Sequence, residues 1–195
     1  MSKIFVIEHL EPQLWKWCKF EYENISKIVG KTNLLFTNVK RKNKFLESIG
    51  KVEKNRIFEL NLDEKRFCIL DPDAKEILTP EDEKRFDYFI FGGILGDDPP
   101  RKRTGPELSS FIPNAEKRHI GDRQMSTDNA VLTTKLILEG KKFEDINFVD
   151  SPELEMGKFR FLELPYRYIN VGTKEKPIPQ MSKRLFQFLK NKKGF

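Results

Sequence analysis

The stretch that decides the fold is Asp87-Tyr88-Phe89-Ile90-Phe91-Gly92-Gly93-Ile94-Leu95-Gly96-Asp97. Its first half is almost entirely apolar, as is typical of a central strand buried on both faces of a parallel sheet. Its second half is a glycine-rich turn, and glycine lets the backbone take up a positive φ and approach a ligand closely. A strand that ends in such a turn indicates a ligand pocket at the carboxyl edge of the sheet.

A second loop of this kind lies further along the chain, at His119-Ile120-Gly121-Asp122-Arg123-Gln124-Met125-Ser126-Thr127. It follows a short strand-like run at 117–120 and leads into a helical pattern at 127–139. Two such loops at the carboxyl ends of strands predict a pocket for a small, nucleotide-like molecule.

The rest of the chain alternates between strand and helix patterns. Apolar runs predict strands, and apolar residues at helical spacing between capping residues predict helices. This alternation predicts an α/β fold with a mainly parallel sheet and helices on both faces, in one domain that spans residues 1–195. The irregular piece at 97–113 is expected to be a lid or binding loop. The expected strands are 3–8, 33–37, 66–70, 87–91 and 117–120, with later extended segments at 148–149, 159–164 and 166–169; the expected helices are 12–30, 42–49, one that starts at 79–82, 127–139 and 181–192.

Composition excludes several classes of protein. The chain has 195 residues, of which 38% are apolar and 17 are Phe, so a disordered chain is not expected. No apolar run is long enough for a membrane span, and Glu8 and His9 come too early for a secretory signal, so a cytoplasmic location is expected. Cys18 and Cys68 lie among bulky residues and are predicted to be buried thiols. With two histidines besides, no metal site is predicted.

The net charge of +6 has two interpretations. Local basic clusters fit contacts with a phosphate backbone or with an acidic partner such as the ribosome. Because 30 acidic residues are interleaved with them, they also fit an ordinary solvated surface. The clusters are Lys40-Arg41-Lys42 with Lys44, Arg101-Lys102-Arg103, Lys117-Arg118, and Lys190, Lys192 and Lys193 in the tail.

Two common cofactor signatures are missing from the sequence. It contains neither G-x-G-x-x-G after the first strand nor G-x-x-x-x-G-K-S/T. The residues after the first strand, Glu8-His9-Leu10-Glu11, are acidic and bulky, and the glycine turns come in the second half of the chain. This order disfavours a dinucleotide enzyme, a P-loop NTPase and a Rossmann-type methyltransferase.

Three loops in order, Leu70-Asp71-Pro72, Gly92 to Asp97, and Ile120 to Thr127, resemble the cofactor loops of SPOUT methyltransferases. The third is similar to the I-G-D-x-x-L-T loop of bacterial tRNA guanine-N1 methyltransferases. The longer runs at 86–97 and at 164–168 (Leu-Pro-Tyr-Arg-Tyr) resemble a narrower branch more closely. That branch holds the fungal enzyme that methylates an arginine of a small-subunit ribosomal protein, and archaeal predicted RNA methyltransferases.

The resemblance implies a C-terminal trefoil knot and S-adenosylmethionine (SAM) bound by the three loops. It places Leu70 and Pro72 beside the cofactor. In the second loop, Gly93, Leu95 and Gly96 would lie against its ribose and methionine part. In the third loop, Ile120, Gly121, Met125 and Thr127 would surround the adenine. The implied cofactor residues are Leu70, Asp71, Pro72, Gly92, Gly93, Leu95, Gly96, Ile120, Gly121, Asp122, Met125, Ser126 and Thr127.

The chemistry of methyl transfer narrows the catalytic candidates. A free guanidinium is a poor nucleophile because its pKa exceeds about 12, so a carboxylate must orient it and accept its proton. Asp97, Asp98 and Asp122 lie on the loops and Glu8 at the end of the first strand; Asp97 and Glu8 are the predicted pair. Asp122 also fits a helix cap, and Glu8 also fits an ion pair with a lysine.

Three functions remain open from the sequence. The branch favours transfer to a protein arginine, on a small-subunit ribosomal protein. An RNA acceptor, tRNA or rRNA, would need a carboxylate too, and a non-catalytic ribosome- or RNA-binding module that keeps the fold is a third interpretation. A monomer is favoured over a homodimer, because the segments after Gly140 could cover the usual SPOUT dimer face.

Overall fold

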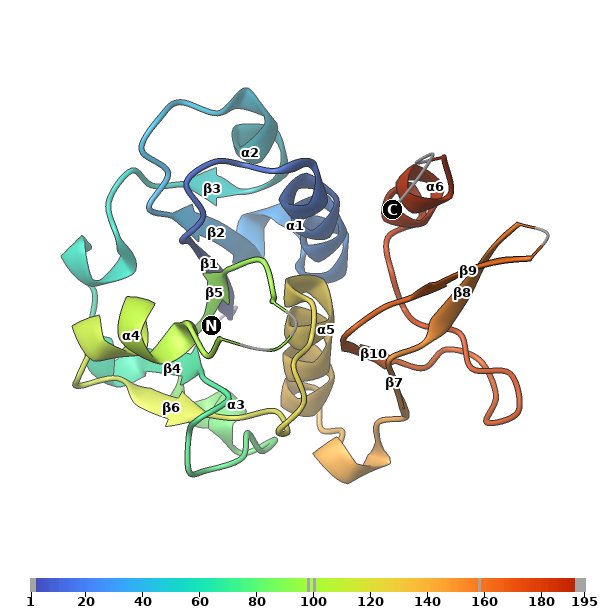
Figure 1. The fold of residues 1–195 in the computed structure, drawn as a ribbon. Coiled ribbons are helices and arrows are strands. Elements are labelled where there is room, and N and C mark those ends of the chain that lie inside the picture. Colours follow the sequence, from blue (N-terminus) through green and yellow to red (C-terminus); the bar gives the residue numbers. More distant parts are fainter. Residues whose placement is uncertain (1–2, 98, 100, 158, 192–195) are drawn as a thin grey trace.

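The computed structural model describes residues 3–191 except 98, 100 and 158, and within them the core is a six-stranded parallel sheet (Figure 1). The strand order is β3-β2-β1-β5-β4-β6, so β1 and β5 lie at the centre. The prediction of an α/β fold with a parallel sheet is confirmed. The strands are β1 Ile4–His9, β2 Leu34–Thr37, β3 Lys51–Val52, β4 Phe67–Leu70, β5 Tyr88–Gly93 and β6 Glu116–Arg118.

The strands β1, β2, β4 and β5 are buried on both faces, which explains why most of their residues are apolar. On β1, Phe5 and Ile7 join the core on one face and Val6 joins the core on the other. The first face is covered by α1 (Lys16–Val29), α2 (Lys44–Ile49) and α5 (Thr127–Leu138). The second face is covered by Ile57 and Phe58 of the 3-10 turn Ile57–Glu59 and by Leu108 and Ile112. Leu108 and Ile112 flank the 3-10 turn Ser109–Phe111, which follows α4 (Thr104–Glu107).

The apolar residues of helix α1 recur at helical spacing and so pack on one face of the sheet. Cys18, Tyr22, Ile25 and Val29 are buried at helical spacing and face the sheet. The helix ends at Gly30, whose φ of +82° suits glycine and whose N–H donates to the Ser26 carbonyl at 3.0 Å.

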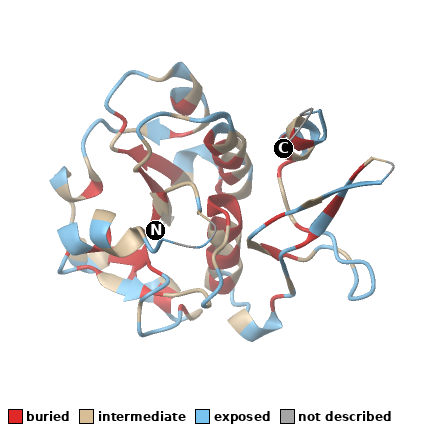
Figure 2. Cartoon of the chain, viewed as in Figure 1, coloured by how far each residue is buried: buried red, intermediate tan, exposed pale blue. Residues whose placement is uncertain are grey.

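A smaller C-terminal lobe packs beside α1 and α5 (Figure 1, orange to red). Its core includes Leu154, Tyr168 and Leu185, with Phe20 of α1 packed against them. In Figure 2 the buried residues gather in the sheet and along α1 and α5. The lobe consists of β7 Phe148–Asp150 paired antiparallel with β10 Arg167–Ile169, the hairpin of β8 Glu153–Gly157 and β9 Arg160–Glu163, and α6 Lys183–Asn191.

The expected elements agree with the structure apart from a few differences. The first helix begins at Lys16 rather than residue 12, because Trp15 is still in an extended conformation. The two-residue β3 and the strand β8 were not expected. The piece at 97–113 contains α4, so it is less irregular than expected. The helix expected at 79–82 is α3 (Asp82–Arg85), which begins at the last of these residues.

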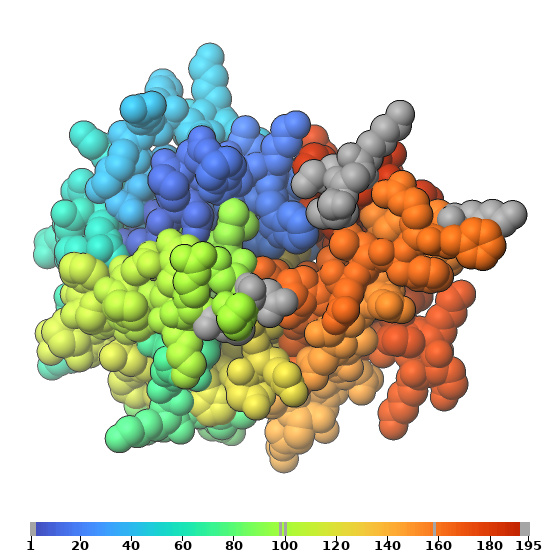
Figure 3. Space-filling model, in the orientation of Figure 1, coloured from blue at the N-terminus to red at the C-terminus, as the bar shows by residue number. Residues whose placement is uncertain are grey.

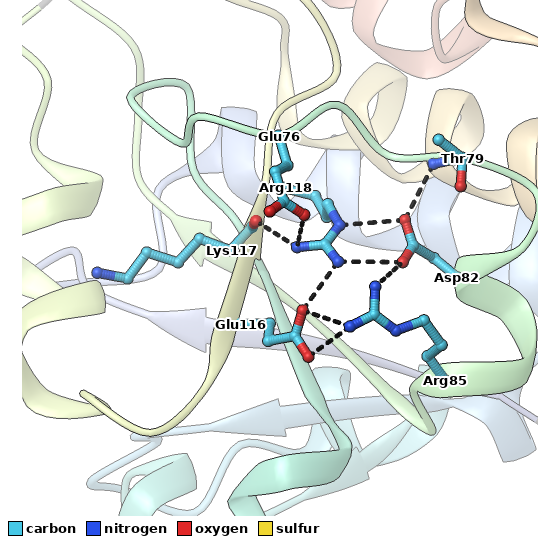
Figure 4. A network of polar contacts seen from close by, with 7 residues as sticks. All are labelled: Glu76, Thr79, Asp82, Arg85, Glu116, Lys117 and Arg118. Atoms are coloured by element: carbon cyan, nitrogen blue, oxygen red, sulfur yellow. Dashed lines mark hydrogen bonds and ion pairs between the residues drawn. The ribbon is translucent and has the colours of Figure 1, made fainter.

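An ion-pair network at the end of β6 fastens the edge of the sheet (Figure 4). The Arg118 guanidinium is buried; its Nε donates to Asp82 Oδ2 at 3.2 Å and its Nη2 donates to Glu116 Oε2 at 2.8 Å. Glu76 lies 3.1 Å from Nη1, and Arg85 contacts both Asp82 and Glu116. Of the expected basic cluster Lys117-Arg118, Arg118 is therefore used inside the structure rather than for binding a partner. The network also holds the segment 76–85 against β6.

Both cysteines are buried and free, as predicted. Burial raises the pKa of the Cys18 thiol to about 12, so it is not a reactive thiolate. None of the described helices combines the length and the apolar composition that a bilayer crossing needs. Nor do His, Cys, Asp and Glu side chains gather anywhere in the described residues as a group of three that could hold a metal.

Candidate functional site

Three loops leave the carboxyl ends of β4, β5 and β6 (Figure 1). They line a cavity of about 380 Å³, to which Thr127 and Ala130 of the first turn of α5 also contribute. The carboxyl ends of parallel strands meet at one edge of a sheet, so the strand order alone brings these loops together. In the space-filling view, segment 101–113 (green), segment 120–126 (yellow) and the C-terminal lobe (orange) meet on one face (Figure 3).

The cavity is lined by both apolar and charged residues. Such a mixture suits a ligand that has a flat apolar part and several polar groups. The apolar lining residues are Leu70, Pro72, Phe91, Ile94, Leu95, Ile120, Met125 and Ala130; the charged ones are Asp71, Asp73, Asp97, Arg101, Lys102, Arg103, Asp122 and Arg123.

Two glycines let the backbone run close against its neighbours here. A Cβ on Gly96 would collide with the Gln124 amide and lie 2.7 Å from the Tyr166 hydroxyl. Gly121 has a φ of +95°, and a Cβ there would lie 2.7 Å from the ring of Phe143. A side chain at Gly96 would displace the Gln124 amide and the Tyr166 hydroxyl, and one at Gly121 would in addition strain the backbone because of the positive φ.

The C-terminal lobe holds two of the loops together. The Tyr166 hydroxyl donates to the Gly96 carbonyl at 2.7 Å, and the Arg167 N–H donates to the Gln124 carbonyl at 2.8 Å. The Gln124 side chain in turn donates to the Asp97 carbonyl at 3.3 Å. The cavity therefore depends on contacts between segments that lie far apart in the sequence.

Asp97 lies in the wall of the cavity, where its carboxylate pairs with Arg101 at 2.9 Å. Asp122 also lines the cavity, with its side chain 90% exposed. The residue that caps α5 is Ser126, so the interpretation of Asp122 as a helix cap is wrong. Asp98 lies outside the described residues.

Glu8 is not in the cavity, which corrects the expectation that it is a catalytic carboxylate. It is fully buried, and the Thr37 hydroxyl, the Arg56 Nε (2.6 Å) and the Ile57 N–H (3.0 Å) all donate to it. Its ion-pair partner is Arg56 rather than a lysine. With its oxygens occupied inside the protein, Glu8 has a structural role and no access to a substrate.

A family model described as "Protein arginine N-methyltransferase SFM1-like" matches residues 4–194. The chain belongs to this family. The protein arginine N-methyltransferase SFM1 of Saccharomyces cerevisiae (strain ATCC 204508 / S288c) is 40% identical over 194 residues, which cover 89% of each chain.

Solved structures agree with this SFM1-like assignment. The crystal structure of the yeast arginine methyltransferase SFM1 complexed with SAM is similar with a TM-score of 0.87 and 37% identity, over 97% of this chain and 91% of that one. The complex of yeast SFM1 with SAH has a TM-score of 0.84 at 37% identity, over 96% and 94%. The dual specific Trm10 of Thermococcus kodakaraensis, with a TM-score of 0.54 and 21% identity over 73% and 96%, shares the fold.

Two of the expected cofactor residues of this SFM1-like chain do not line the cavity. Gly93 is the last residue of β5, and the Tyr22 hydroxyl packs directly where its Cβ would be. Ser126 donates to Asp128 Oδ1 at 2.7 Å inside the start of α5. The other expected residues do line it: Leu70, Asp71, Pro72, Gly92, Leu95, Gly96, Ile120, Gly121, Asp122, Met125 and Thr127.

Two further residues, Glu11 and Arg103, position the second loop and were not predicted from the sequence to do so. Glu11 accepts from the Leu95 N–H at 3.1 Å and from Arg103 Nη1 at 2.8 Å, so it positions the second loop. Arg103 also pairs with Glu107 at 2.7 Å. The position of Glu11 could have been predicted, because this residue follows β1 at the same carboxyl edge of the sheet as the three loops.

Two buried carboxyl groups, Glu21 of α1 and Asp128 of α5, lie behind the cavity residue Thr127. Trp17 Nε1 donates to Glu21 at 2.7 Å, and Asn24 donates to Asp128 at 2.8 Å. Burial raises the pKa of Glu21 to about 8, and the charge of Asp128 adds to the rise. Burial raises the pKa of Asp128 as well.

This pair predicts a pH dependence of stability. In the unfolded chain Glu21 loses its proton around its ordinary pKa of 4.5, whereas the folded protein keeps it to about pH 8. Between these values the folded state binds more protons, so the free energy of unfolding falls as pH rises. Urea denaturation between pH 5 and pH 8 should show a falling midpoint, and Glu21→Gln should remove most of the fall.

Glu23→Gln, in the same helix but less buried, serves as the matched control. It should leave the fall with pH unchanged, since Lys27 and Arg184, the described ion-pair partners of Glu23, are exposed and such pairs contribute little. An equal flattening in both variants would contradict the assignment to Glu21.

Proposed function

We propose that this protein is a SAM-dependent methyltransferase that transfers a methyl group to an arginine of a protein, on a small-subunit ribosomal protein. The observation that carries the proposal is the cavity formed by the three loops, in a chain with a TM-score of 0.87 to SFM1 complexed with SAM. The relative that is 40% identical is a protein arginine N-methyltransferase, which supports a protein arginine as the methyl acceptor.

The cavity fits SAM in size and in chemistry. Its volume of about 380 Å³ falls within the range of small-molecule sites. Leu70 and Pro72 of the first loop would lie beside the cofactor, and Ile120, Gly121, Met125 and Thr127 of the third loop would surround its adenine. Leu95 and the close-packed Gly96 suit the ribose and methionine part. When bound, SAM supplies a methyl group on a sulfonium that a nucleophile displaces in line.

Asp97 is the proposed proton acceptor. A substrate guanidinium is protonated at neutral pH and must lose a proton as its nitrogen forms the new bond. Asp97 already pairs with a guanidinium, that of Arg101, at 2.9 Å. We propose that the substrate arginine takes the place of Arg101, so that the carboxylate orients the reacting nitrogen and receives its proton.

We also propose that residues 1–195 form one SPOUT domain with a C-terminal trefoil knot that acts as a monomer in the cytoplasm. The SFM1- and Trm10-like fold supports the knot. The contacts of Tyr166 and Arg167 with the cavity loops support one domain, because they join the C-terminal lobe to the site. Light scattering should give the mass of one chain.

Tritiated SAM and isolated small ribosomal subunits provide the test of function. After incubation, protein and RNA are separated, and the labelled protein is hydrolysed to identify the amino acid. The expected result is label in methylarginine. Label in RNA would replace the proposal with an RNA methyltransferase, and SAM binding with no transfer to either would replace it with a non-catalytic module.

Gly121→Ala tests the position of the cofactor. The φ of +95° and the contact of 2.7 Å with Phe143 leave no room for a side chain, so the loop must shift. Calorimetry should show SAH affinity at least tenfold weaker, a loss of about 1.4 kcal/mol.

The matched control is Gly140→Ala. Gly140 also has a positive φ, +100°, but nothing lies within 4 Å of its Cβ position and it does not line the cavity. This variant should lose stability and keep SAH affinity. Equal weakening of SAH binding in both variants would show that backbone strain alone, rather than the cavity, is responsible.

A further inference from the structure

Nine basic residues lie on or beside three helices, α1, α2 and α6, that are far apart in the sequence. We call this surface the basic ridge. All of its cationic side chains are exposed. It consists of Lys16 and Lys19 of α1, Lys40, Arg41, Lys42 and Lys44 at the start of α2, and Lys183, Arg184 and Lys190 of α6.

Helix α1 joins the two ends of the ridge. The Lys19 ammonium lies 6.0 Å from the centre of the Phe45 ring in α2. The Lys16 ammonium lies 5.8 Å from the centre of the Phe188 ring in α6. In Figure 1, α2, α1 and α6 follow one another along the upper side of the molecule, and none of the ridge residues lines the cavity.

Unlike the other basic clusters, the ridge is almost free of ion pairs. Within the described residues, only Arg184 of the ridge pairs with a carboxylate, Glu23, at 2.9 Å. By contrast, Arg101, Lys102 and Arg103 are each paired with an acidic side chain at 2.9 Å or less. Unpaired cations close together repel each other and raise the local positive potential, which favours an anionic partner.

We propose that the basic ridge binds the phosphate backbone of RNA and so docks the protein on a ribonucleoprotein. Lysine and arginine spread along a surface are the usual means of sequence-independent phosphate binding. Trp15, 43% exposed, stands next to Lys16 and offers a ring on which an unpaired base can stack. RNA would then be a docking partner, and the methyl group would still go to protein.

The structure favours RNA over a membrane or an acidic protein. Membrane-surface helices place an apolar face in the lipid, but α6 buries Leu185 and Leu189 in the lobe and packs Phe188 against Phe20. Protein interfaces have an apolar centre. Among the described ridge elements and their flanks, Trp15 is the one large exposed apolar side chain.

Fluorescence anisotropy with a labelled 24-nucleotide RNA hairpin, without cofactor, provides the test. The wild-type dissociation constant is measured between 50 and 200 mM KCl, because each phosphate contact contributes about 0.7 to 0.9 to the salt slope. The triple variant Lys40→Gln/Arg41→Gln/Lys42→Gln should bind at least tenfold more weakly, with a slope shallower by about 2.

The control variant Lys141→Gln/Lys174→Gln/Lys176→Gln removes the same charge from exposed positions outside the ridge. It should bind RNA within about twofold of wild type, since it removes no phosphate contact of the ridge. Equal weakening by both variants would overturn the proposal, because binding would then follow net charge alone. So would equally tight binding of wild type to phosphatidylserine vesicles or to polyglutamate.

Both triple variants should keep wild-type SAH affinity in calorimetry, which verifies that they are folded. The binding assay needs no methyl transfer. Its failure therefore leaves the proposed arginine methylation standing, and a failure of the labelling experiment leaves the RNA result standing.

Discussion

Replacing Asp97 with asparagine should lower kcat by about 10²- to 10⁴-fold, the range typical of the loss of a general base. Asparagine has the same shape as aspartate, and the Asp97 carbonyl that accepts from Gln124 is retained. The loop should therefore keep its position while the proton acceptor is lost. Tritium transfer to small ribosomal subunits at saturating SAM measures kcat, and calorimetry measures SAH affinity, which should change by no more than about twofold.

Asp122→Asn is the matched control for this prediction. Asp122 lines the same cavity, but its side chain is 90% exposed and its contact with Arg167 is long, at 3.9 Å. Its loss should affect kcat far less. If the two variants lose activity equally, or if Asp97→Asn abolishes SAH binding, Asp97 is not the proton acceptor.

Replacing Glu8 with alanine should lower the free energy of unfolding by about 3–5 kcal/mol, the cost of breaking a buried ion pair by removing one partner. The substitution leaves the Arg56 guanidinium, the Thr37 hydroxyl and the Ile57 N–H without their acceptor. Arg56 is anchored at the same place by the rings of Phe58 and Phe111, at 4.9 and 4.4 Å, so it cannot follow a new partner easily. Urea denaturation at neutral pH measures the loss.

A double-mutant cycle separates the ion pair from simple loss of packing. Arg56→Ala should also destabilise the protein, and the double variant should lose clearly less than the sum of the two single losses, because the partners act together. A Glu8→Ala protein with unchanged stability and a large loss of kcat would restore the catalytic role that the geometry argues against.

The alternation of residues along β1 predicts the direction of the Glu8 side chain but not its partner, which is why its catalytic role was predicted wrongly. Glu8 has the same parity as Val6 on β1, so it points to the second face of the sheet, away from α1 and α5. Its partner Arg56 comes from a segment whose path the sequence pattern does not reveal. The sequence pattern therefore predicts which face of the sheet Glu8 points to, but not that Arg56 lies on that face.

Gly93 illustrates the same limit on β5. It lies on the same face of β5 as Phe91 and Phe89, and the Tyr22 hydroxyl of α1 packs against it. Gly93 therefore does not line the cavity, although its neighbours Phe91 and Gly92 do. By contrast, the loops after β4, β5 and β6 were predictable, because parallel strands and glycine turns are local signals with one geometric outcome. The C-terminal contacts, such as Tyr166 with Gly96, depend on tertiary packing and were not predictable.

The pairing of β1 with β5 has a consequence for how the chain folds. It joins Ile4 to Tyr88 and His9 to Gly93, so β1 and β5 can pair only after more than eighty further residues have been synthesised. Contacts so distant in sequence make folding slow. Val6 and Ile7 of β1 are fully buried in the folded protein. During synthesis, the edge of β1 that later pairs with β5 has no partner strand. An unpaired apolar strand edge promotes aggregation, so the nascent chain is most prone to aggregate before β5 is made.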